Sequence, residues 1–232
     1  MEIKNFILDL LFPKFCLGCQ REGSYLCEDC KATLEISETH QKYKTKYLSD
    51  LYHPSSYQKS LIKNLIRSFK YEPFVKELAK PLSSLIIDHF QLIDHPPPFF
   101  GGGPNFEDYI LISVPLEKRK LKRRGFNQAE ELGKELAKYF KIPLISDCLI
   151  KIKETQPQMD LSEEERRENI KGVFFIKNRE KIRERKILLI DDVYTTGSTM
   201  TECAQILKGA GAKEVIGIVV ARASPTDDRL II

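Results

Sequence analysis

Residues 187–199 read Ile-Leu-Leu-Ile-Asp-Asp-Val-Tyr-Thr-Thr-Gly-Ser-Thr, and this stretch decides the fold. Four apolar residues in a row predict a buried strand, and two carboxylates, Asp191 and Asp192, stand where that strand ends. A turn rich in hydroxyl groups follows, and a helix is predicted to begin near Ser198. A helix N-terminus offers free N–H groups and a positive dipole end, so the turn is expected to hold a phosphate monoester. The acidic pair is expected to accept hydrogen bonds from sugar hydroxyls or to contact a divalent cation through water.

Strands and helices alternate around this stretch. Such alternation predicts an α/β fold with a parallel sheet flanked by helices, whose ligands bind at the carboxyl ends of the strands. The predicted strands are Tyr109–Val114, Ile142–Ile145, Val173–Ile176, Lys186–Ile190 and Val215–Ala221. The predicted helices are Tyr57–Phe69, Phe74–Phe90, Asn127–Phe140 and Ser198–Lys208, with a basic loop at Pro115–Phe126 and a proline- and glycine-rich loop at His95–Asn105.

Four of the six cysteines form two Cys-x2-Cys pairs within fifteen residues. Two such pairs can present four thiolates to one metal ion, which is the closed tetrahedral shell of structural zinc. The zinc is therefore expected to hold residues 1–40 together as a module, beside a second domain of residues 41–232. Disulfide pairing and redox chemistry are the alternatives. The four residues are Cys16, Cys19, Cys27 and Cys30, whereas Cys148 and Cys203 are expected to be buried thiols.

Leu188–Thr199 resembles the fingerprint of the type I phosphoribosyltransferases, which bind 5-phosphoribosyl-1-pyrophosphate (PRPP) with magnesium. The resemblance implies that the two carboxylates hold the ribose hydroxyls as the catalytic acidic residues, and that the loop holds the 5′-phosphate. The PRPP-binding residues that it implies are Asp191, Asp192, Val193, Tyr194, Thr195, Thr196, Gly197, Ser198 and Thr199. A strand that ends in carboxylates also occurs in Walker B motifs and receiver-type pockets, but the chain has no Gly-x-x-x-x-Gly-Lys-Ser/Thr motif for an ATPase.

Six of the seven residues from Lys118 to Arg124 are basic. A run of this kind is usually a solvated surface, but here it follows a predicted strand and precedes a helix, as the pyrophosphate loop of phosphoribosyltransferases does. The triplet Arg124-Gly-Phe also resembles the pyrophosphate loop of adenine phosphoribosyltransferases. The implied pyrophosphate-binding residues are Arg119, Arg123, Arg124 and Gly125. The outer lysines Lys118, Lys120 and Lys122 are candidates for contacts with nucleic acid.

Further segments narrow the resemblance to the ComF family. They are Pro115-Leu116, Arg124–Ala129, Lys151–Thr155 and Ala221-Arg222, and the cysteine pairs stand before the phosphoribosyltransferase-like part as in that family. ComF proteins are linked to natural transformation. The resemblance therefore implies a role in DNA uptake on the cytoplasmic side, with single-stranded DNA and a DNA-translocating ATPase as partners.

Residues 151–172 lie where type I enzymes carry a mobile hood loop over the active site. The polar hood residues implied by the resemblance are Lys153, Thr155, Gln158, Arg166 and Asn169. An ordinary amphipathic helix at Leu161–Ile170 explains the same charges, and both interpretations stay open. An enzyme of this type would transfer the phosphoribosyl group to a nucleophile, with loss of pyrophosphate through an oxocarbenium-like transition state.

The acceptor of such a transfer is not identifiable, because no pocket for an acceptor base can be recognised in the sequence. A non-catalytic adaptor of the DNA-uptake machinery, which binds single-stranded DNA or senses the metabolite, therefore remains the alternative. A purely structural adaptor for the ATPase is a third interpretation.

Composition sets outer limits on these interpretations. The 232 residues carry 37 basic and 33 acidic side chains, so the net charge of +4 excludes a histone-like basic protein, and any basic patch must be local. Hydrophobic residues make up 42% of the chain, which argues against wholesale disorder. No apolar run reaches the 18 or so residues of a membrane span, and the stretch Ile3–Phe15 is predicted to form a short amphipathic helix instead of a signal peptide.

Overall fold

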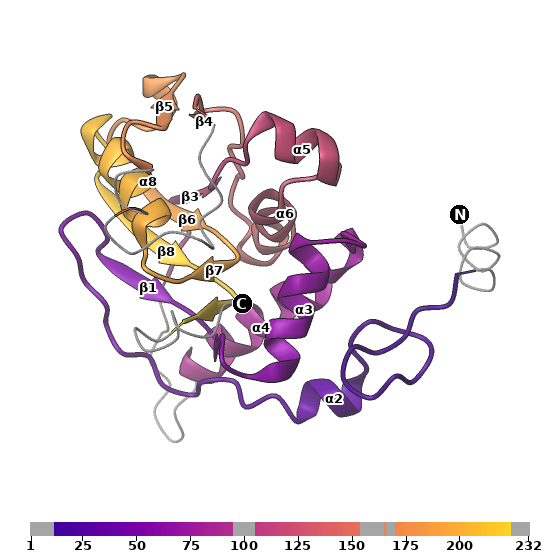
Figure 1. Cartoon of the computed structure of the whole chain (residues 1–232). Helices are drawn as coiled ribbons and strands as arrows, with labels where there is room; N and C mark the ends of the chain where they lie inside the picture. Colours follow the sequence, from indigo (N-terminus) through magenta and orange to yellow (C-terminus); the bar gives the residue numbers. More distant parts are fainter. Residues whose placement is uncertain (1–11, 95–104, 154–164, 166–169, 224–232) are drawn as a thin grey trace.

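The computed structural model describes residues 12–94, 105–153, 165 and 170–223, and its centre is a parallel sheet (Figure 1). Four strands lie in the order β1-β8-β6-β3, and all neighbouring pairs are parallel. Their bounds are Asp50–Tyr52 for β1, Tyr109–Ser113 for β3, Lys186–Ile190 for β6 and Glu214–Ile218 for β8. The parallel sheet between helices confirms the predicted fold class.

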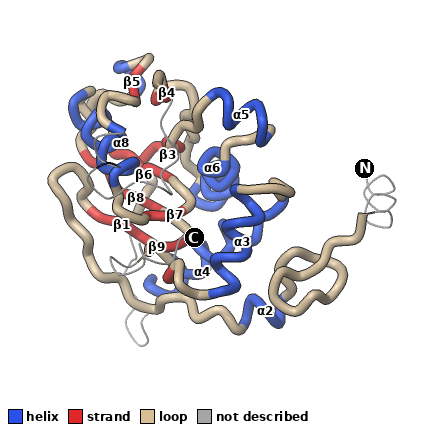
Figure 2. The backbone as a smooth tube through the Cα atoms, viewed as in Figure 1, coloured by secondary structure: helices blue, strands red, loops and turns tan. Residues whose placement is uncertain are grey.

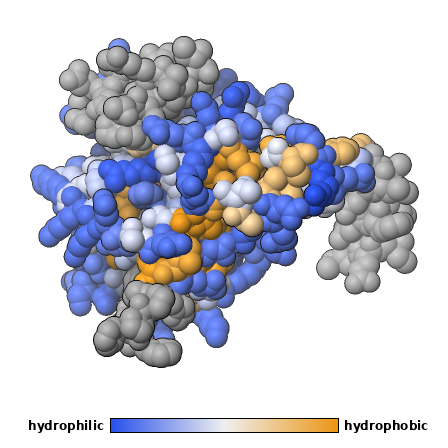
Figure 3. All heavy atoms as spheres, turned by 90° about the horizontal axis from the view of Figure 1, so that it is seen from below, coloured by the Kyte–Doolittle hydropathy of each residue, from blue (hydrophilic) through white to orange (hydrophobic). Residues whose placement is uncertain are grey.

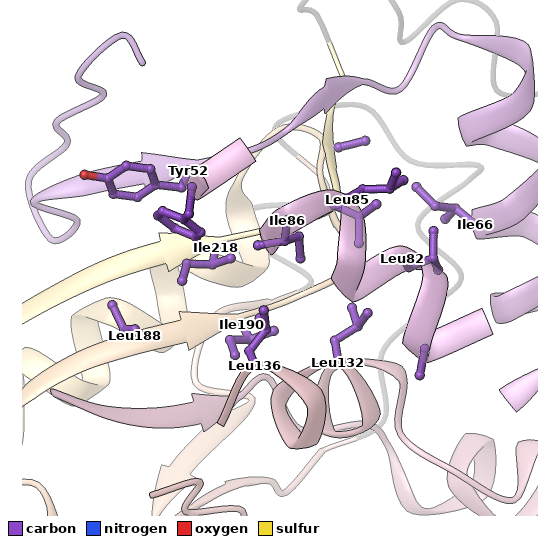
Figure 4. Packing of buried hydrophobic residues seen from close by; sticks show 14 of the residues in the cluster. Tyr52, Ile66, Leu82, Leu85, Ile86, Leu132, Leu136, Leu188, Ile190 and Ile218 are labelled. Carbon is purple, nitrogen blue, oxygen red and sulfur yellow. The ribbon is translucent and has the colours of Figure 1, made fainter. Parts of the chain in front are cut away.

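Helices cover both faces of the sheet. They are α3 (Ser60–Lys70), α4 (Ala79–Asp94) and α6 (Gln128–Phe140) on one face, and α8 (Ser198–Gly209) on the other. Alternate residues of β6 divide between the two faces, because successive side chains of a strand point in opposite directions. Leu188 and Ile190 pack with Leu132 and Leu136 of α6, as Figure 4 shows, whereas Leu189 belongs to the cluster of α8. Burial on both faces explains why the strand reads as a continuous apolar run.

Two small sheets extend the central one. Strands β2 (Ser55–Ser56), β9 (Ala221–Arg222) and β7 (Val193–Tyr194) form a parallel sheet in the order β2-β9-β7. Strands β4 (Leu149–Lys151) and β5 (Phe174–Ile176) pair antiparallel. Because β7 and β9 follow the carboxyl ends of β6 and β8, their pairing fixes the backbone just beyond the edge where the acidic pair lies.

The cysteine-bearing segment packs beside the helices of the second domain. Its helix α2 (Glu28–Ala32) is followed by a long connection that runs along the lower side of the molecule in Figure 1 to reach β1. Leu26 and Leu34, on either side of α2, belong to the same hydrophobic cluster as Ile62 and Leu65 of α3. The first nine residues of the predicted N-terminal helix, Ile3–Leu11, lie outside the described residues, and Phe12–Phe15 are not helical.

Three predictions about secondary structure were wrong. The basic segment after β3 is a helix, α5 (Lys118–Arg124), which ends where Gly125 adopts a left-handed conformation with φ of 81°. Lysine and arginine have good helix propensity, and this outweighed the expectation of a loop. The predicted strand at Ile142–Ile145 makes only an isolated bridge, Leu111 to Leu144. The predicted last strand is interrupted after Ile218 and resumes as β9.

Strand β1 was missed. Its three residues are all buried, and three residues are too few to display a period of two against the helical spacing around them. The second predicted helix begins as a 3-10 turn, Lys76–Leu78, before α4, and this places Pro81 in the first turn of α4, where proline is tolerated. A second 3-10 turn spans Arg179–Lys181. Figure 2 shows how the helices and strands are distributed along the chain.

The face of the molecule seen from below is largely hydrophilic. Figure 3, which views the molecule from below, shows one band of apolar side chains on a face otherwise covered by hydrophilic residues. Among the described residues, no helix has both the length and the apolar character that a membrane crossing requires. Cys148 and Cys203 are fully buried free thiols, as predicted, and burial raises the pKa of each thiol.

Candidate functional site

The two carboxylates stand at the carboxyl end of β6, where the backbone is hydrogen-bonded to the segment that follows β8. The N–H of Asp191 donates to the carbonyl of Ile218 at 3.1 Å, and the carbonyl of Asp192 accepts from the N–H of Val220 at 3.0 Å. Asp192 is only 5% exposed, and one oxygen of its carboxylate accepts from the N–H of Val193 at 2.7 Å. Both side chains line the same pocket.

Burial disfavours the charged form of Asp191. Burial and, after it, the neighbouring charge of Asp192 raise the pKa of Asp191, Lys70 acts in the opposite direction, and the net pKa is about 7. Lys70, the last residue of α3, forms an ion pair with Asp192 at 2.8 Å between Nζ and Oδ1. The site is therefore built to share protons or cations between two closely spaced carboxylates.

The turn after the pair leads directly into a helix N-terminus. Residues Thr195 and Thr196 follow β7, Gly197 takes a left-handed conformation with φ of 74°, and α8 begins at Ser198. The first turn of α8 contains no acidic residue. The hydroxyl oxygens of Thr196 and Ser198 lie 2.9 Å apart. Hydroxyl groups and the backbone N–H groups of the first helical turn thus gather at the positive end of the helix dipole, which suits an anion.

Gly197 is required by close packing beneath this turn. A Cβ atom at this position would overlap Oη and Cζ of Tyr194. The Tyr194 ring is 5% exposed, and its hydroxyl lies 3.2 Å from the hydroxyl of Tyr43. Tyr194 therefore supports the turn from below, and glycine lets the backbone approach it.

The basic helix α5 forms the opposite wall. Arg123 and Arg124 both lie over the ring of Phe74, with centroid distances of 5.5 and 5.8 Å. The guanidinium of Arg124 also donates to Oε1 of Gln128, whose Nε2 donates to the carbonyl of Phe69 at 2.9 Å. Lys120, predicted as an outer residue, lines the pocket, whereas Arg119, Gly125, Lys118 and Lys122 are not among its lining residues.

These elements enclose a pocket of about 440 Å³. Sequence reasoning identified its acidic pair, its turn and its arginines, but it missed the contributions of Lys70, Tyr71, Phe74 and Lys151. A lysine at the end of a helix is ordinary in sequence, since it complements the helix dipole. No local signal distinguished Lys70 from such a lysine.

The predicted hood lies only partly within the described residues. Lys153 is exposed, and Thr155, Gln158, Arg166 and Asn169 lie outside the described part of the chain. Ile170 and Phe174, on the far side of that segment, line the pocket. The residues that return from the segment therefore contribute an apolar part of the wall.

The four paired cysteines converge at a second site. The Sγ atoms of Cys16, Cys19, Cys27 and Cys30 all lie within 4.8 Å of one another, and those of Cys19 and Cys27 are 3.6 Å apart. Tetrahedral zinc with Zn–S bonds of about 2.3 Å separates its sulfur ligands by about 3.8 Å, so the set fits zinc. All the cysteines are free.

Backbone geometry favours the thiolate form of Cys16, whereas hydrogen bonds with Cys19 and Cys27 raise the pKa of Cys30. The N–H groups of Gly18 and Cys27 point to Sγ of Cys16 at 3.4 Å each. Burial raises the pKa of Cys16, but the backbone N–H groups outweigh that effect and lower it to about 6. A Cβ on Gly18 would lie 2.7 Å from Sγ of Cys30, so the tight turn requires glycine.

Known proteins are similar to about half of the chain. The sequence profile of the phosphoribosyl transferase domain family matches residues 122–229. Competence protein F of Haemophilus influenzae is 36% identical over 114 residues, which cover 49% of this chain and 50% of that protein. The DNA utilization protein YhgH of Escherichia coli O157:H7 is 38% identical over 105 residues, or 45% of each protein.

A third relative is the competence protein ComFC of Streptococcus pneumoniae, which is 36% identical over 112 residues, 47% of this chain and 46% of the relative. The match thus spans about half the length of each of these relatives. Together with the parallel sheet and its flanking helices, the profile match identifies the fold as that of a type I phosphoribosyltransferase domain.

Proposed function

We propose that the chain, which carries a phosphoribosyltransferase domain, belongs to the ComF family and that its pocket binds PRPP with magnesium. One observation carries the proposal. Three features that are separate in sequence line one pocket: the acidic pair, the turn at the start of α8, and the arginines of α5. They offer, respectively, acceptors for sugar hydroxyls, donors for a phosphate monoester and cations for a diphosphate.

The charge of the pocket favours a polyanionic ligand. Its lining includes five basic side chains, Lys70, Lys120, Arg123, Arg124 and Lys151, against the two carboxylates Asp191 and Asp192. In the proposed complex, residues 195–199 hold the 5′-phosphate through backbone N–H and hydroxyl groups. The acidic pair accepts hydrogen bonds from the ribose diol, and Arg123 and Arg124 hold the diphosphate.

Magnesium fits the acidic pair because Asp191 and Asp192 bring two carboxylates, the ligands that magnesium prefers, into the lining of the same pocket. A cation near the carboxylate favours its ionised form. When bound, the metal would neutralise charge on the diphosphate. The chain's own part in a transfer reaction is to orient the ribose by its diol and to stabilise the departing diphosphate with the two arginines.

We propose further that the protein acts in DNA uptake on the cytoplasmic side of the membrane. The support is the naming of its relatives as competence and DNA utilization proteins. Single-stranded DNA and a DNA-translocating ATPase are the proposed partners, and the exposed lysines Lys118 and Lys122 of α5 are candidates for contacts with DNA. The cysteine cluster is proposed to hold a structural zinc ion.

Calorimetric titration with PRPP and magnesium tests the site. The wild-type chain should bind, and the double variant Asp191→Asn with Asp192→Asn should not bind measurably, because the diol loses both charged acceptors. Asp147→Asn is the matched control, since Asp147 lies on the surface and pairs with Lys181. A wild-type protein without affinity for PRPP, or a double variant with unchanged affinity, would refute the proposal.

Turnover separates the enzyme from the binding protein. Release of pyrophosphate in the presence of a candidate acceptor supports a transferase. DNA affinity that falls steeply with salt, without pyrophosphate release, supports the adaptor.

A further inference from the structure

Lys70 forms a direct ion pair with the acidic pair of the pocket. Its Nζ lies 2.8 Å from Oδ1 of Asp192, and both side chains are largely buried, at 27% and 7% exposure. Lys70 also lies outside residues 122–229, so the match to the phosphoribosyl transferase domain gives it no role. Lys70 is the last residue of α3, a helix from the first half of the chain, and the packing of that helix places it in the pocket.

The end of α3 is held rigidly. Ile62, Leu65, Ile66 and Phe69 are fully buried and follow the helical spacing of a core-facing stripe. The carbonyl of Phe69 accepts the hydrogen bond from Gln128, and the Phe69 ring packs against Phe126 at 5.5 Å. The residue after Phe69 is therefore fixed relative to the start of α6 and to the arginines beside it.

The ammonium group of Lys70 carries more N–H donors than its ion pair with Asp192 requires. A lysine carries three N–H donors, and the ion pair with Asp192 uses one of them. Burial opposes the charged form of Lys70, but the charges of Asp192 and Asp191 raise its pKa, so the group stays protonated. It lines the same pocket as Arg123 and Arg124.

We propose that Lys70 is a diphosphate-binding residue, which donates to Asp192 and to the diphosphate of the ligand at the same time. This inference rests on the proposed binding of PRPP. Two buried carboxylates beside a polyanion repel it, and a cation shared between them removes that repulsion. Lys70 thereby makes the acidic site compatible with a ligand that carries both a diol and a diphosphate.

Two ligands distinguish this role from a structural one. PRPP and ribose 5-phosphate share the diol and the 5′-phosphate, but only PRPP carries the diphosphate. If Lys70 binds the diphosphate, Lys70→Met should weaken PRPP binding by about 10- to 100-fold and ribose 5-phosphate binding much less. If Lys70 only positions Asp192, the variant should weaken both ligands by the same factor, and that result would overturn the inference.

Arg67→Met is the matched control, because Arg67 is an exposed cation one turn earlier on α3. It should leave both affinities unchanged. Lys70→Met leaves Asp192 buried without its partner, so folding is checked by circular dichroism. Lys70→Gln is the second variant, since its amide can still donate to Asp192, and the same preferential loss of PRPP affinity is expected.

The outcomes separate the two proposals. A wild-type chain that binds neither ligand refutes the proposed function. A wild-type chain that binds PRPP, with Lys70 variants that keep the wild-type ratio of the two affinities, refutes only the role of Lys70.

Discussion

Replacing Gly197 by alanine tests how the turn before α8 is built. The residue has φ of 74°, and an added Cβ would overlap Oη and Cζ of Tyr194 and lie 2.8 Å from Cε1. Carbon atoms in favourable contact are about 3.5–4.0 Å apart, so either the ring or the turn must move. Tyr194 has little freedom to do so, because it is buried and its hydroxyl is paired with that of Tyr43.

The expected cost follows from three effects. A left-handed conformation costs a non-glycine residue about 1–2 kcal/mol, and overpacking costs about 1–3 kcal/mol. Alanine also lowers the conformational entropy of the unfolded chain, which stabilises the folded state by about 0.4–1 kcal/mol. Gly197→Ala should therefore lower the free energy of unfolding by about 1–4 kcal/mol, measured by urea unfolding followed with circular dichroism.

Gly209→Ala is the control, because nothing lies within 4 Å of its added Cβ and its φ is not in the left-handed region. It should be neutral or slightly stabilising. Combining Gly197→Ala with Tyr194→Ala should cost about 1–3 kcal/mol less than the sum of the two single changes, because the collision is gone. The close-packing argument would be refuted if the costs of Gly197→Ala and Tyr194→Ala were strictly additive. It would also be refuted if Gly197→Ala and Gly209→Ala were equally stable.

Three further predictions concern protonation, zinc and the basic helix. Burial, then the charge of Arg222, lowers the pKa of His53 from 6.5 to about 4, so the unfolded chain takes up a proton first as the pH falls. The His53 contribution to the free energy of unfolding should fall from about pH 6.5 to pH 4, by at most about 1.4 kcal/mol per pH unit, whereas the raised pKa of Asp191 acts in the opposite direction over that range. In urea titrations at several pH values, the stability of the wild-type chain relative to His53→Gln should therefore decrease as the pH falls, and a constant difference would contradict the assignment. Elemental analysis should find one zinc per chain, unchanged in Cys148→Ser, and chelation should remove hydrogen-exchange protection first from residues 12–35; a zinc-free chain with full protection would contradict the assignment. Arg124→Met should weaken PRPP binding about 10- to 100-fold by calorimetry and Arg119→Met hardly at all, and similar losses in both variants would contradict the geometry of α5.

Local sequence was sufficient where one segment carries the whole feature. Four consecutive apolar residues predicted β6, and the glycine and hydroxyl residues after the acidic pair predicted the start of α8. The two Cys-x2-Cys pairs predicted a cluster whose sulfur atoms indeed lie within reach of one metal ion. In each case the residues that form the feature are neighbours in the chain, so spacing alone determines which side chains meet.

Features made by distant segments escaped prediction. Lys70 meets Asp192 across more than a hundred residues, and only the packing of α3 on α6 brings them together. Tyr43 supports Tyr194 from the connection that follows α2, again through tertiary packing. Neither contact leaves a periodic or compositional signal, because a single lysine or tyrosine is common on any surface.

The basic segment shows how secondary structure determines which of its cations line the pocket. The prediction grouped Arg119 with Arg123 and Arg124 because the run stands between a strand and a helix, as the pyrophosphate loop of phosphoribosyltransferases does. In the helix α5, residues three and four apart share a face. Lys120, Arg123 and Arg124 satisfy that spacing and line the pocket, whereas Arg119 and Lys122 lie at other angles and do not. The phase of one short helix thus selects the cations that face the acidic pair, and it leaves Lys118 and Lys122 exposed for other contacts.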